Sequence, residues 1–432
     1  MSKKIVRLLT LVLAIAMVAG LAVGCGGDNS GTGGGGSSAN GVNPEDYRGT
    51  SVTYVTWKDP ALNEDGPVVE KFKQEYGIDV KIQLVEQKNY VSIIASNIAA
   101  GTQGDIFFET ETFPGSLTVM QPLDAAKLDL TDPIWEQSMI KASTVGGHPY
   151  LVDTVSNVWS ERTILVYNKS IFENNNITTP AQYVEAGKWT FENFRYVCKQ
   201  VKDLGKSYKG AALIGEPAIA SCGASFFKFE NDKMVVTADK RLYDAMNLLA
   251  SMKQEGLVHL GYEAFGDGTY GMAITNCFAL KKTGYYTNFN SNHLAATYTP
   301  SWNGSEETVN SSLFRGWGLI DGAKNPVAAG IFLREYLDVN NYDLATAFHN
   351  QDVANFFFQV ISESSERQYY FGGSMCRIYN NDIRIHEAWI SQTPATMNSY
   401  LDGQKNVMNN MAEKANKDID KEIQYLKETY GE

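Results

Sequence analysis

Hydrophobic and polar positions follow two regular periods along the chain and predict an alternation of strands and helices. Residues 50–57 alternate β-branched and aromatic side chains, which indicates a strand. Residues 67–76 then place apolar side chains at helical spacing, and Gly77 follows as a stop signal. The alternation continues with a strand at 78–86, a helix at 89–101 and a strand at 104–110. This order predicts an α/β fold with a mostly parallel sheet covered by helices.

The same two periods continue through the rest of the chain. We expect strands at 164–167 and 270–280, helices at 190–205 and 239–256, a strand, turn and helix over 312–337, and a long amphipathic helix at 410–431. Thr190 and Asp239 are the predicted N-caps of two of these helices. Because the part that follows residue 46 is longer than one core usually organises, two lobes are expected.

The first 46 residues have a different composition and predict an anchor and a tether. Basic residues precede an uncharged apolar stretch that ends in small residues at Gly24, the layout of a secretory signal peptide over 1–24. The order Leu-Ala-Val-Gly-Cys resembles a bacterial lipobox, in which Cys25 is acylated and becomes the first residue. Residues 25–46 are rich in glycine and serine and predict a flexible tether. We therefore expect a lipid-anchored protein on the extracellular face of the cell membrane; the alternative is a cleaved signal peptide with an incidental Cys25.

Composition and charge exclude several classes of function. The chain has 37 Lys plus Arg against 49 Asp plus Glu, a net charge of −12, and no basic cluster after the signal segment, so nucleic acid is not an expected partner. Aromatic residues make up 12% of the chain, which suits sugar binding as well as core packing. The histidines are scattered, and neither a zinc-helix motif nor a nucleophile elbow is present, so we expect no metal, no cofactor and no enzymatic activity.

The remaining cysteines leave two possibilities open. Cys198, Cys222, Cys277 and Cys376 are irregularly spaced. Disulfides are permitted outside the cell, but the sequence cannot pair them, and four buried thiols are equally compatible.

A series of motifs, in a fixed order, resembles a known family. These motifs are VTYVTW, GDIFF, PLD at 122–124, GGHPY, LVYNKSIFENNNITTP, GKWTFENF, FGDGTYGMAITNCFAL and GAKNPVAAGIFLREYL. Their order is similar to that in extracellular solute-binding protein family 1, the maltose-binding-protein-like receptors of carbohydrate ABC importers. The resemblance covers nearly all of the chain after the tether.

The resemblance implies a two-lobed periplasmic-binding-protein-like fold with a ligand cleft at the hinge. We expect residues 47–159 plus 299–373 in lobe 1 and residues 160–298 plus 374–432 in lobe 2, with crossings near Trp159, Tyr298 and Gly373. The expected function is capture of a sugar, most simply an oligosaccharide, by a monomer that delivers it to the permease subunits of an ABC importer. Ligand must contact both lobes, because it shifts the open and closed populations only by its differential affinity for them.

Candidate ligand-binding residues come first from the strand ends. In open α/β sheets, ligands bind outside the carboxyl ends of the strands. The residues at two such ends are Lys58, Asp59, Glu109 and Glu111. The alternative for Glu109 and Glu111 is an ordinary exposed loop, and Trp57, just before Lys58, is expected in the core.

Further candidates are implied by the resemblance. Glu161, six residues before Tyr167, matches a hinge acid that accepts hydrogen bonds from sugar hydroxyls, and Phe278 matches a tryptophan platform. Glu216 matches an acid that precedes a proline, but Ala218 stands where maltose receptors have an aromatic residue, which puts maltodextrin in doubt. Trp159, Trp302 and Trp317 complete the set because they lie near the crossings. Core packing is the alternative for each aromatic residue. We expect Trp135 and Trp389 in the core and Trp189 as a structural staple before a helix.

Two other functions remain compatible with these residues. The acidic loop at 109–111 is also compatible with a receptor of the same fold that binds a peptide or a polyamine. A secreted glycoside hydrolase would use two of the same carboxylates as a catalytic pair.

Overall fold

The computed structural model describes residues 42–431 apart from 63–64, 87–88, 111, 157–161, 214, 305–308, 310, 363–367 and 372–390. Residues 1–38 and 39–432 form separate units, and all described residues belong to the second unit. Cys25, in the predicted lipobox, lies outside the described residues, as do Glu111, Trp159, Glu161, Cys376 and Trp389.

The first lobe is built on a five-stranded sheet in the order β2-β1-β3-β15-β4. Its strands are β1 (Ser51–Thr56), β2 (Asp79–Leu84), β3 (Ile106–Thr110), β4 (Met120–Gln121) and β15 (Arg315–Ile320). The helices that accompany it are α2 (Gly66–Tyr76), α3 (Tyr90–Ala99), α4 (Gln137–Ala142) and α10 (Pro326–Tyr336), and the short strands are β5 (Thr144–Val145) and β6 (His148–Pro149). Phe72 of α2 and Phe332 of α10 pack edge to face, with ring centroids 5.1 Å apart, in the same core as Tyr54 of β1.

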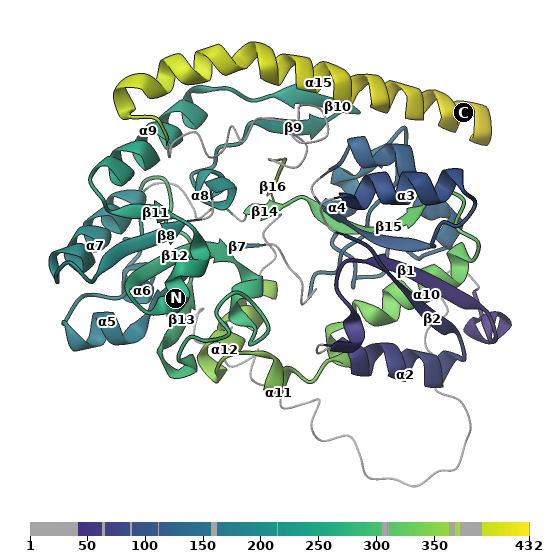
Figure 1. Cartoon of the computed structure of the whole chain (residues 1–432), viewed down its shortest axis with the longest axis horizontal. Helices are drawn as coiled ribbons and strands as arrows, with labels where there is room; N and C mark the ends of the chain where they lie inside the picture. Colours follow the sequence, from purple (N-terminus) through teal and green to yellow (C-terminus); the bar gives the residue numbers. More distant parts are fainter. Residues whose placement is uncertain are drawn as a thin grey trace, which may run out of the picture. The chain divides into compact units, whose positions relative to one another are not determined.

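The second lobe is built on a five-stranded sheet in the order β11-β8-β12-β7-β13. Its strands are β7 (Thr163–Asn168), β8 (Lys209–Leu213), β11 (Val258–Leu260), β12 (Tyr270–Asn276) and β13 (Leu294–Thr297). Helices α5 (Lys169–Asn174), α6 (Pro180–Glu185), α7 (Phe191–Asp203), α8 (Gly215–Ser221) and α9 (Lys240–Gln254) and the hairpin β9 (Phe227–Glu230) with β10 (Lys233–Val236) belong to the same part of the chain (Figure 1). The predicted caps are confirmed: Thr190 accepts from the Asn193 amide and Asp239 from the Leu242 amide.

Each sheet contains one reversed strand, and the reversed strand is the one that the chain enters on arriving from the other lobe. β1 is parallel to β2 and β3, whereas β15 is antiparallel to β3 and β4. In the second sheet, β8 is parallel to β11 and β12, and β7 is antiparallel to β12 and β13. The predicted mostly parallel sheets are therefore confirmed, with one exception in each.

The segments that connect the lobes lie next to one another. Strands β14 (Ser311–Leu313) and β16 (Gln368–Tyr370) pair in parallel, and Arg162 forms a bridge with Ser312. A third connection differs from the expected crossing near Gly373, a residue outside the described part. The chain already reaches the second lobe at α11 (Leu344–Ala347), because Phe348 and the apolar face of α12 (Gln351–Ile361) pack in the core that contains Ile164 of β7.

One long helix contacts both lobes. α15 (Pro394–Tyr430) begins earlier than the predicted 410–431 helix, and runs along α9 and β10 (Figure 1). In the second lobe, the Tyr243 hydroxyl donates to Asp402 at 2.6 Å. In the first lobe, the Tyr150 hydroxyl donates to Glu422, and the ring of Tyr430 lies 4.7 Å from that of His148.

The cysteines in the described part are buried thiols. Cys198, Cys222 and Cys277 form no disulfide with one another, and burial raises the pKa of the Cys198 and Cys222 thiols.

The contact between α15 and β10 predicts a measurable loss of stability on mutation. The Asn416 side-chain amide accepts from the Met234 N–H at 2.7 Å and donates to the Met234 carbonyl at 3.1 Å. Asn416→Ala leaves both backbone groups unpaired and should lower the free energy of unfolding by about 1–3 kcal/mol in urea denaturation. Gln424→Ala, at an exposed position of the same helix, is the control and should change it by less than about 0.5 kcal/mol. Equal effects of the two variants would contradict this role of Asn416.

Candidate ligand-binding cleft

The entering strands bring the carboxyl ends of both sheets to the lobe connections. Arg315, the first residue of β15, pairs with Thr110 at the end of β3, and Thr163 at the start of β7 pairs with Asn276 at the end of β12. The bridge between Arg162 and Ser312 joins the segments that lead into these strands. Residues that follow the strands of either sheet are therefore positioned near one another.

The most direct contact between the strand ends is made by Lys58 and Phe278. Lys58 follows β1, and its ammonium lies 4.8 Å from the centroid of the Phe278 ring, which follows β12. Phe278 is half-buried and packs edge to face against Tyr285 at 5.2 Å. The Asn276 side-chain amide donates to the Tyr285 hydroxyl at 3.3 Å. Two predicted residues, Lys58 and Phe278, thus meet across the lobes, and we call these four side chains the strand-end cluster.

A glycine allows the chain to place Tyr285 beside Phe278. The predicted strand at 270–280 ends at Asn276, and Cys277–Leu280 instead forms the short helix η8. The chain then turns back, with the Gly284 amide donating to the Lys281 carbonyl at 2.9 Å. A Cβ at Gly284 would lie 2.1 Å from the Phe278 carbonyl oxygen, so a larger residue cannot be accommodated without moving the backbone.

Aromatic side chains pack against the end of β1 and hold its backbone in place. Trp57 is half-buried and contacts Tyr90 edge to face at 5.2 Å and Phe108 at 6.1 Å. The Tyr90 hydroxyl donates to the Val55 carbonyl of β1, and burial raises the pKa of this phenol. Trp57 therefore packs against the core, as the sequence indicated, and fixes the backbone from which Lys58 projects.

The strand-end cluster combines apolar planes with polar edges. The Phe278 and Tyr285 rings offer surfaces to the C–H face of a flat ligand, while Lys58 and the hydroxyl and amide of Tyr285 and Asn276 offer hydrogen bonds. In this structure the ammonium lies over the Phe278 ring, a contact that contributes about 0.5–1 kcal/mol at an exposed site.

The structure gives Glu109 an internal role. Glu109 is fully buried, and its Oε1 accepts from the Thr112 amide, the Thr112 hydroxyl and the Phe113 amide. The carboxylate therefore holds the turn that follows β3. Asp59 acts similarly at the end of β1, where its Oδ1 accepts from the Ala61 amide at 2.9 Å in an exposed turn.

The structure places the remaining described candidates in other surroundings. Trp317 is 2% exposed and packs among Tyr54, Phe108 and Tyr336 in the first core, so it cannot contact a ligand there. Trp302 is half-buried, with the Arg241 guanidinium 4.9 Å from its ring. Glu216, at the start of α8, is half-buried and lines a small cavity together with Tyr370 and Phe371. Trp135 and Trp189 are buried, as expected.

The sequence analysis missed Tyr285 and Asn276. Asn276 carried no signal at this position, since the predicted strand continued to residue 280 and ends at Asn276 only in the structure. Tyr285 carried no signal, because only the backward turn at Gly284 brings it to Phe278.

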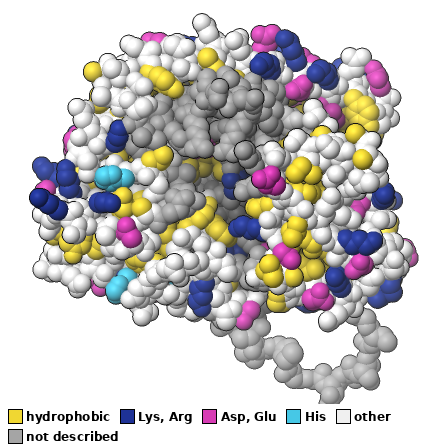
Figure 2. All heavy atoms as spheres, in the orientation of Figure 1, with side chains coloured by type: hydrophobic (Ala, Val, Ile, Leu, Met, Phe, Trp, Pro, Cys, Tyr) yellow, Lys and Arg dark blue, Asp and Glu magenta, His cyan; other side chains and the backbone are white. Residues whose placement is uncertain are grey.

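Three further observations concern metal ligands, membrane-spanning helices and surface charge. Among the described residues, no group of three or more His, Cys, Asp or Glu side chains could hold a metal ion. In the same part of the chain, no helix has the length and apolar character needed to cross a membrane. Lys, Arg, Asp and Glu side chains are interspersed on the face in Figure 2, which also shows a hollow bordered by hydrophobic and basic side chains.

Two α/β sheets whose strand ends meet at the lobe connections define a two-lobed receptor fold. Residues 68–346 match the bacterial extracellular solute-binding proteins, and the chain belongs to this family. The resemblance found in the sequence motifs is thereby confirmed. No protein with curated annotation matches the sequence.

Solved structures of similar fold include several sugar-binding receptors. The galacto-N-biose/lacto-N-biose I-binding protein of an ABC transporter from Bifidobacterium longum, in complex with lacto-N-biose, has a TM-score of 0.61 and 15% identity over 84% of this chain and 97% of that one. An ABC substrate-binding protein from Listeria monocytogenes in complex with cycloalternan has a TM-score of 0.54 and 15% identity, and the match covers 88% of this chain and 99% of that one. The sugar-binding protein MalE from Xanthomonas citri has a TM-score of 0.58 and 13% identity, and the match covers 89% of this chain and 100% of that one. At these identities the likeness establishes the two-lobed fold.

The internal role of Glu109 predicts an effect on stability. Glu109→Ala leaves the buried Phe113 amide and the half-buried Thr112 amide without their acceptor and should lower the free energy of unfolding by about 3 kcal/mol, measured by urea denaturation. Glu185→Ala, an exposed carboxylate on α6, serves as the control. Unchanged stability together with a loss of ligand affinity would instead place Glu109 in contact with ligand.

A buried histidine beside the Phe278 loop predicts a pH dependence. The His349 amide donates to the Leu280 carbonyl, and burial, with the charge of Lys282, lowers the pKa of the His349 imidazole, partly opposed by a hydrogen bond with the Lys281 backbone. Because the unfolded chain then takes up this proton first, the stabilisation is present above the unfolded pKa of about 6.5 and is lost as the pH falls below it. Stability should therefore fall more steeply from about pH 7 to about pH 5 in the wild type than in His349→Gln. Parallel pH profiles would contradict this assignment.

Proposed function

We propose that the chain is the receptor of an ABC importer, that it captures a sugar, most simply an oligosaccharide, in the cleft between its lobes, and that it delivers this sugar to the permease. The observation that carries the proposal is the contact of Lys58 with Phe278, which places an apolar ring and a hydrogen-bond donor from different lobes at one point. Both lobes then contact the ligand, as ligand-dependent closure requires.

The residue types of the strand-end cluster favour a sugar. A pyranose has an apolar C–H face and a rim of hydroxyls, which match the Phe278 and Tyr285 rings and the polar groups of Asn276 and Lys58. The structural neighbours bound to lacto-N-biose and cycloalternan support the same ligand class. Glu216 and Trp302 stay proposed ligand contacts, together with Glu111, Trp159 and Glu161 outside the described residues.

The proposal includes attachment to the membrane through an acylated Cys25, with residues 25–46 as a tether and the folded part as a monomer. The extracellular character of the family supports this location. We infer that the chain releases its ligand unchanged and has no enzymatic activity, in keeping with a family of solute-binding proteins.

A peptide or polyamine ligand is the alternative within the same fold. The basis of this alternative was the acidic loop at 109–111. The burial of the Glu109 carboxylate removes one of its acidic residues from the ligand surface. Lys58 at the strand-end cluster also disfavours a polycation. A glycoside hydrolase is the second alternative, and a test for cleavage addresses it directly.

The substrate class is tested by thermal unfolding of the purified chain with plant and microbial oligosaccharides, amino acids, short peptides and polyamines. A ligand at about 100 times its Kd stabilises the folded state by about 2.7 kcal/mol. We expect a shift with one class of oligosaccharide and no cleavage of it on overnight incubation. A shift with peptides or polyamines alone would overturn the sugar assignment, and cleavage would establish a hydrolase.

The strand-end cluster predicts a specific loss of affinity. Phe278→Ala removes the apolar plane and should weaken oligosaccharide binding about tenfold or more in calorimetry, while the folded content by circular dichroism stays unchanged. Tyr196→Ala on α7, an aromatic residue that is 53% exposed, is the matched control and should leave affinity unchanged. A loss of thermal stability with unchanged affinity would assign Phe278 to the core.

A further inference from the structure

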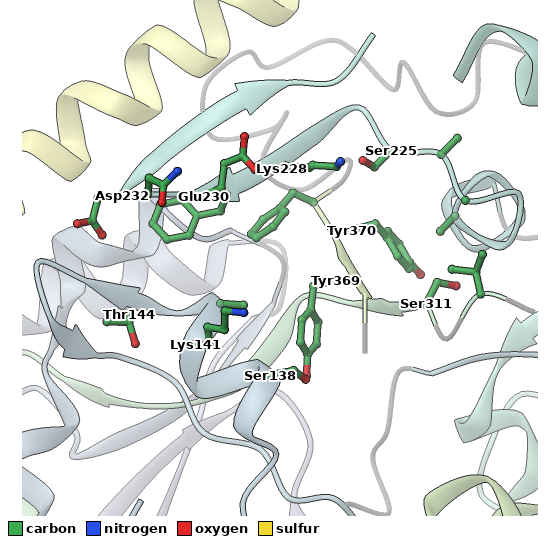
Figure 3. A pocket seen from close by; sticks show the side chains of 18 residues that line it. Ser138, Lys141, Thr144, Ser225, Lys228, Glu230, Asp232, Ser311, Tyr369 and Tyr370 are labelled. Atoms are coloured by element: carbon green, nitrogen blue, oxygen red, sulfur yellow. The ribbon is translucent and has the colours of Figure 1, made fainter. Parts of the chain in front are cut away.

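A second cavity, separate from the strand-end cluster, lies beside the lobe connections. It has a volume of about 780 Å³, within the range typical of small-molecule sites (Figure 3). Three parts of the chain line it: α4 with Thr144, the segment from α8 to the β9–β10 turn, and the connecting strands β14 and β16. None of its lining residues belongs to the strand-end cluster.

The walls of this cavity belong to both lobes. On one side, α4 lies beside the first sheet, where a Cβ at Gly316 of β15 would lie 3.4 Å from the Met139 sulfur. On the other side, α8 and the β9–β10 hairpin belong to the second lobe. At one edge the Gly146 amide donates to Asp232 in the hairpin turn at 3.2 Å, and at another the Ser138 hydroxyl lies 3.5 Å from the Tyr369 hydroxyl (Figure 3). The shape of the cavity therefore depends on how the lobes are arranged.

The lining has the chemistry of a site for a neutral, polyhydroxylated molecule. Lys141 and Lys228 are balanced by Glu230 and Asp232, so the cavity favours neither anions nor cations. Phe229, Tyr369, Tyr370 and Phe371 supply aromatic surface. Figure 3 shows Ser311 and Tyr370 on one side of the cavity and Thr144 and Asp232 on the other.

A buried hydroxyl in this wall has no hydrogen-bond partner among the described residues. Ser311 is 2% exposed, and its Oγ makes no hydrogen bond within that part of the chain. A hydroxyl both donates and accepts, and a buried one left unpaired costs about 1–3 kcal/mol. Because Ser311 lines the cavity, a ligand hydroxyl there can satisfy it.

We propose that this cavity is a second binding site, for a neutral mono- or disaccharide, and that its occupancy is linked to ligand binding in the cleft. A saccharide that contacts both walls favours one arrangement of the lobes. The linkage then follows, since the cleft ligand also discriminates between arrangements. The linkage rests on the proposed function of the cleft, whereas occupancy of the cavity does not.

Occupancy is tested in a chain whose cleft is weakened. Saturation-transfer NMR is recorded on the purified full chain carrying Phe278→Ala, with glucose, galactose, xylose, N-acetylglucosamine, maltose, cellobiose and lactose as probes. We expect at least one saccharide to bind, Ser311→Ala to weaken it about fivefold, and Ala142→Phe, which fills the cavity from α4, to abolish it. Circular dichroism checks that each variant is folded.

Two results would overturn the second site. One is the absence of binding by every probe to the Phe278→Ala chain. The other is binding that neither Ser311→Ala nor Ala142→Phe weakens, because the saccharide would then lie elsewhere. Binding that survives Phe278→Ala and is lost with Ala142→Phe would support the cavity even if the wild-type cleft bound no sugar.

The linkage is tested separately, in the wild-type chain. Saturation with the cavity saccharide should change the Kd of the cleft oligosaccharide about fivefold or more, and the change should disappear in Ala142→Phe. An unchanged Kd at saturation would overturn the linkage.

Discussion

The arrangement of the site depends on one constraint on chain direction. A strand that arrives from the other lobe must begin at the edge where the chain enters, and in both sheets this is the edge where β3 and β12 end. β7 and β15 therefore run against their neighbours and satisfy the backbone hydrogen bonds of those strands. The same reversal places Arg162 and Ser312 side by side, so the connections and the strand ends form one region. Candidate ligand residues from both lobes meet there because of backbone pairing.

Two charged side chains of this region, Lys58 and Glu109, each contact other groups of the protein. The Lys58 ammonium rests on the Phe278 ring, and the Glu109 carboxylate is consumed by backbone amides and a hydroxyl. The first contact is at the surface and exchanges readily, whereas the second is buried and structural. The Glu109 carboxylate is therefore unavailable at the surface, whereas the Lys58 ammonium lies at an exposed position.

The sequence predicted what depends on local spacing. The strand at β1, the helix α2 and the caps Thr190 and Asp239 follow from side-chain period and hydrogen-bonding capacity within a few residues. Trp317 was a candidate ligand residue and is core instead, because sheet register points it toward Tyr54 while its glycine neighbours face the other side.

The parts of the site that the sequence did not predict depend on contacts between distant residues. Tyr285 belongs to the cluster because a turn folds it back, and the Glu109 carboxylate is internal because the turn after β3 closes on it. Lys58 and Phe278 were predicted separately, from a strand end and from a family resemblance. Their contact needs both sheets in place.

The amide of Asn416 also has a consequence for how the molecule behaves in a crowded solution. The outward N–H and C=O of Met234 belong to the open side of a two-stranded hairpin, where a strand from another molecule could add. A helix side chain occupies both groups and makes this side unavailable as a template. A chain that lost this contact would expose unpaired backbone groups on the edge of the hairpin. Self-association would begin at this edge, without any change in the ligand cleft.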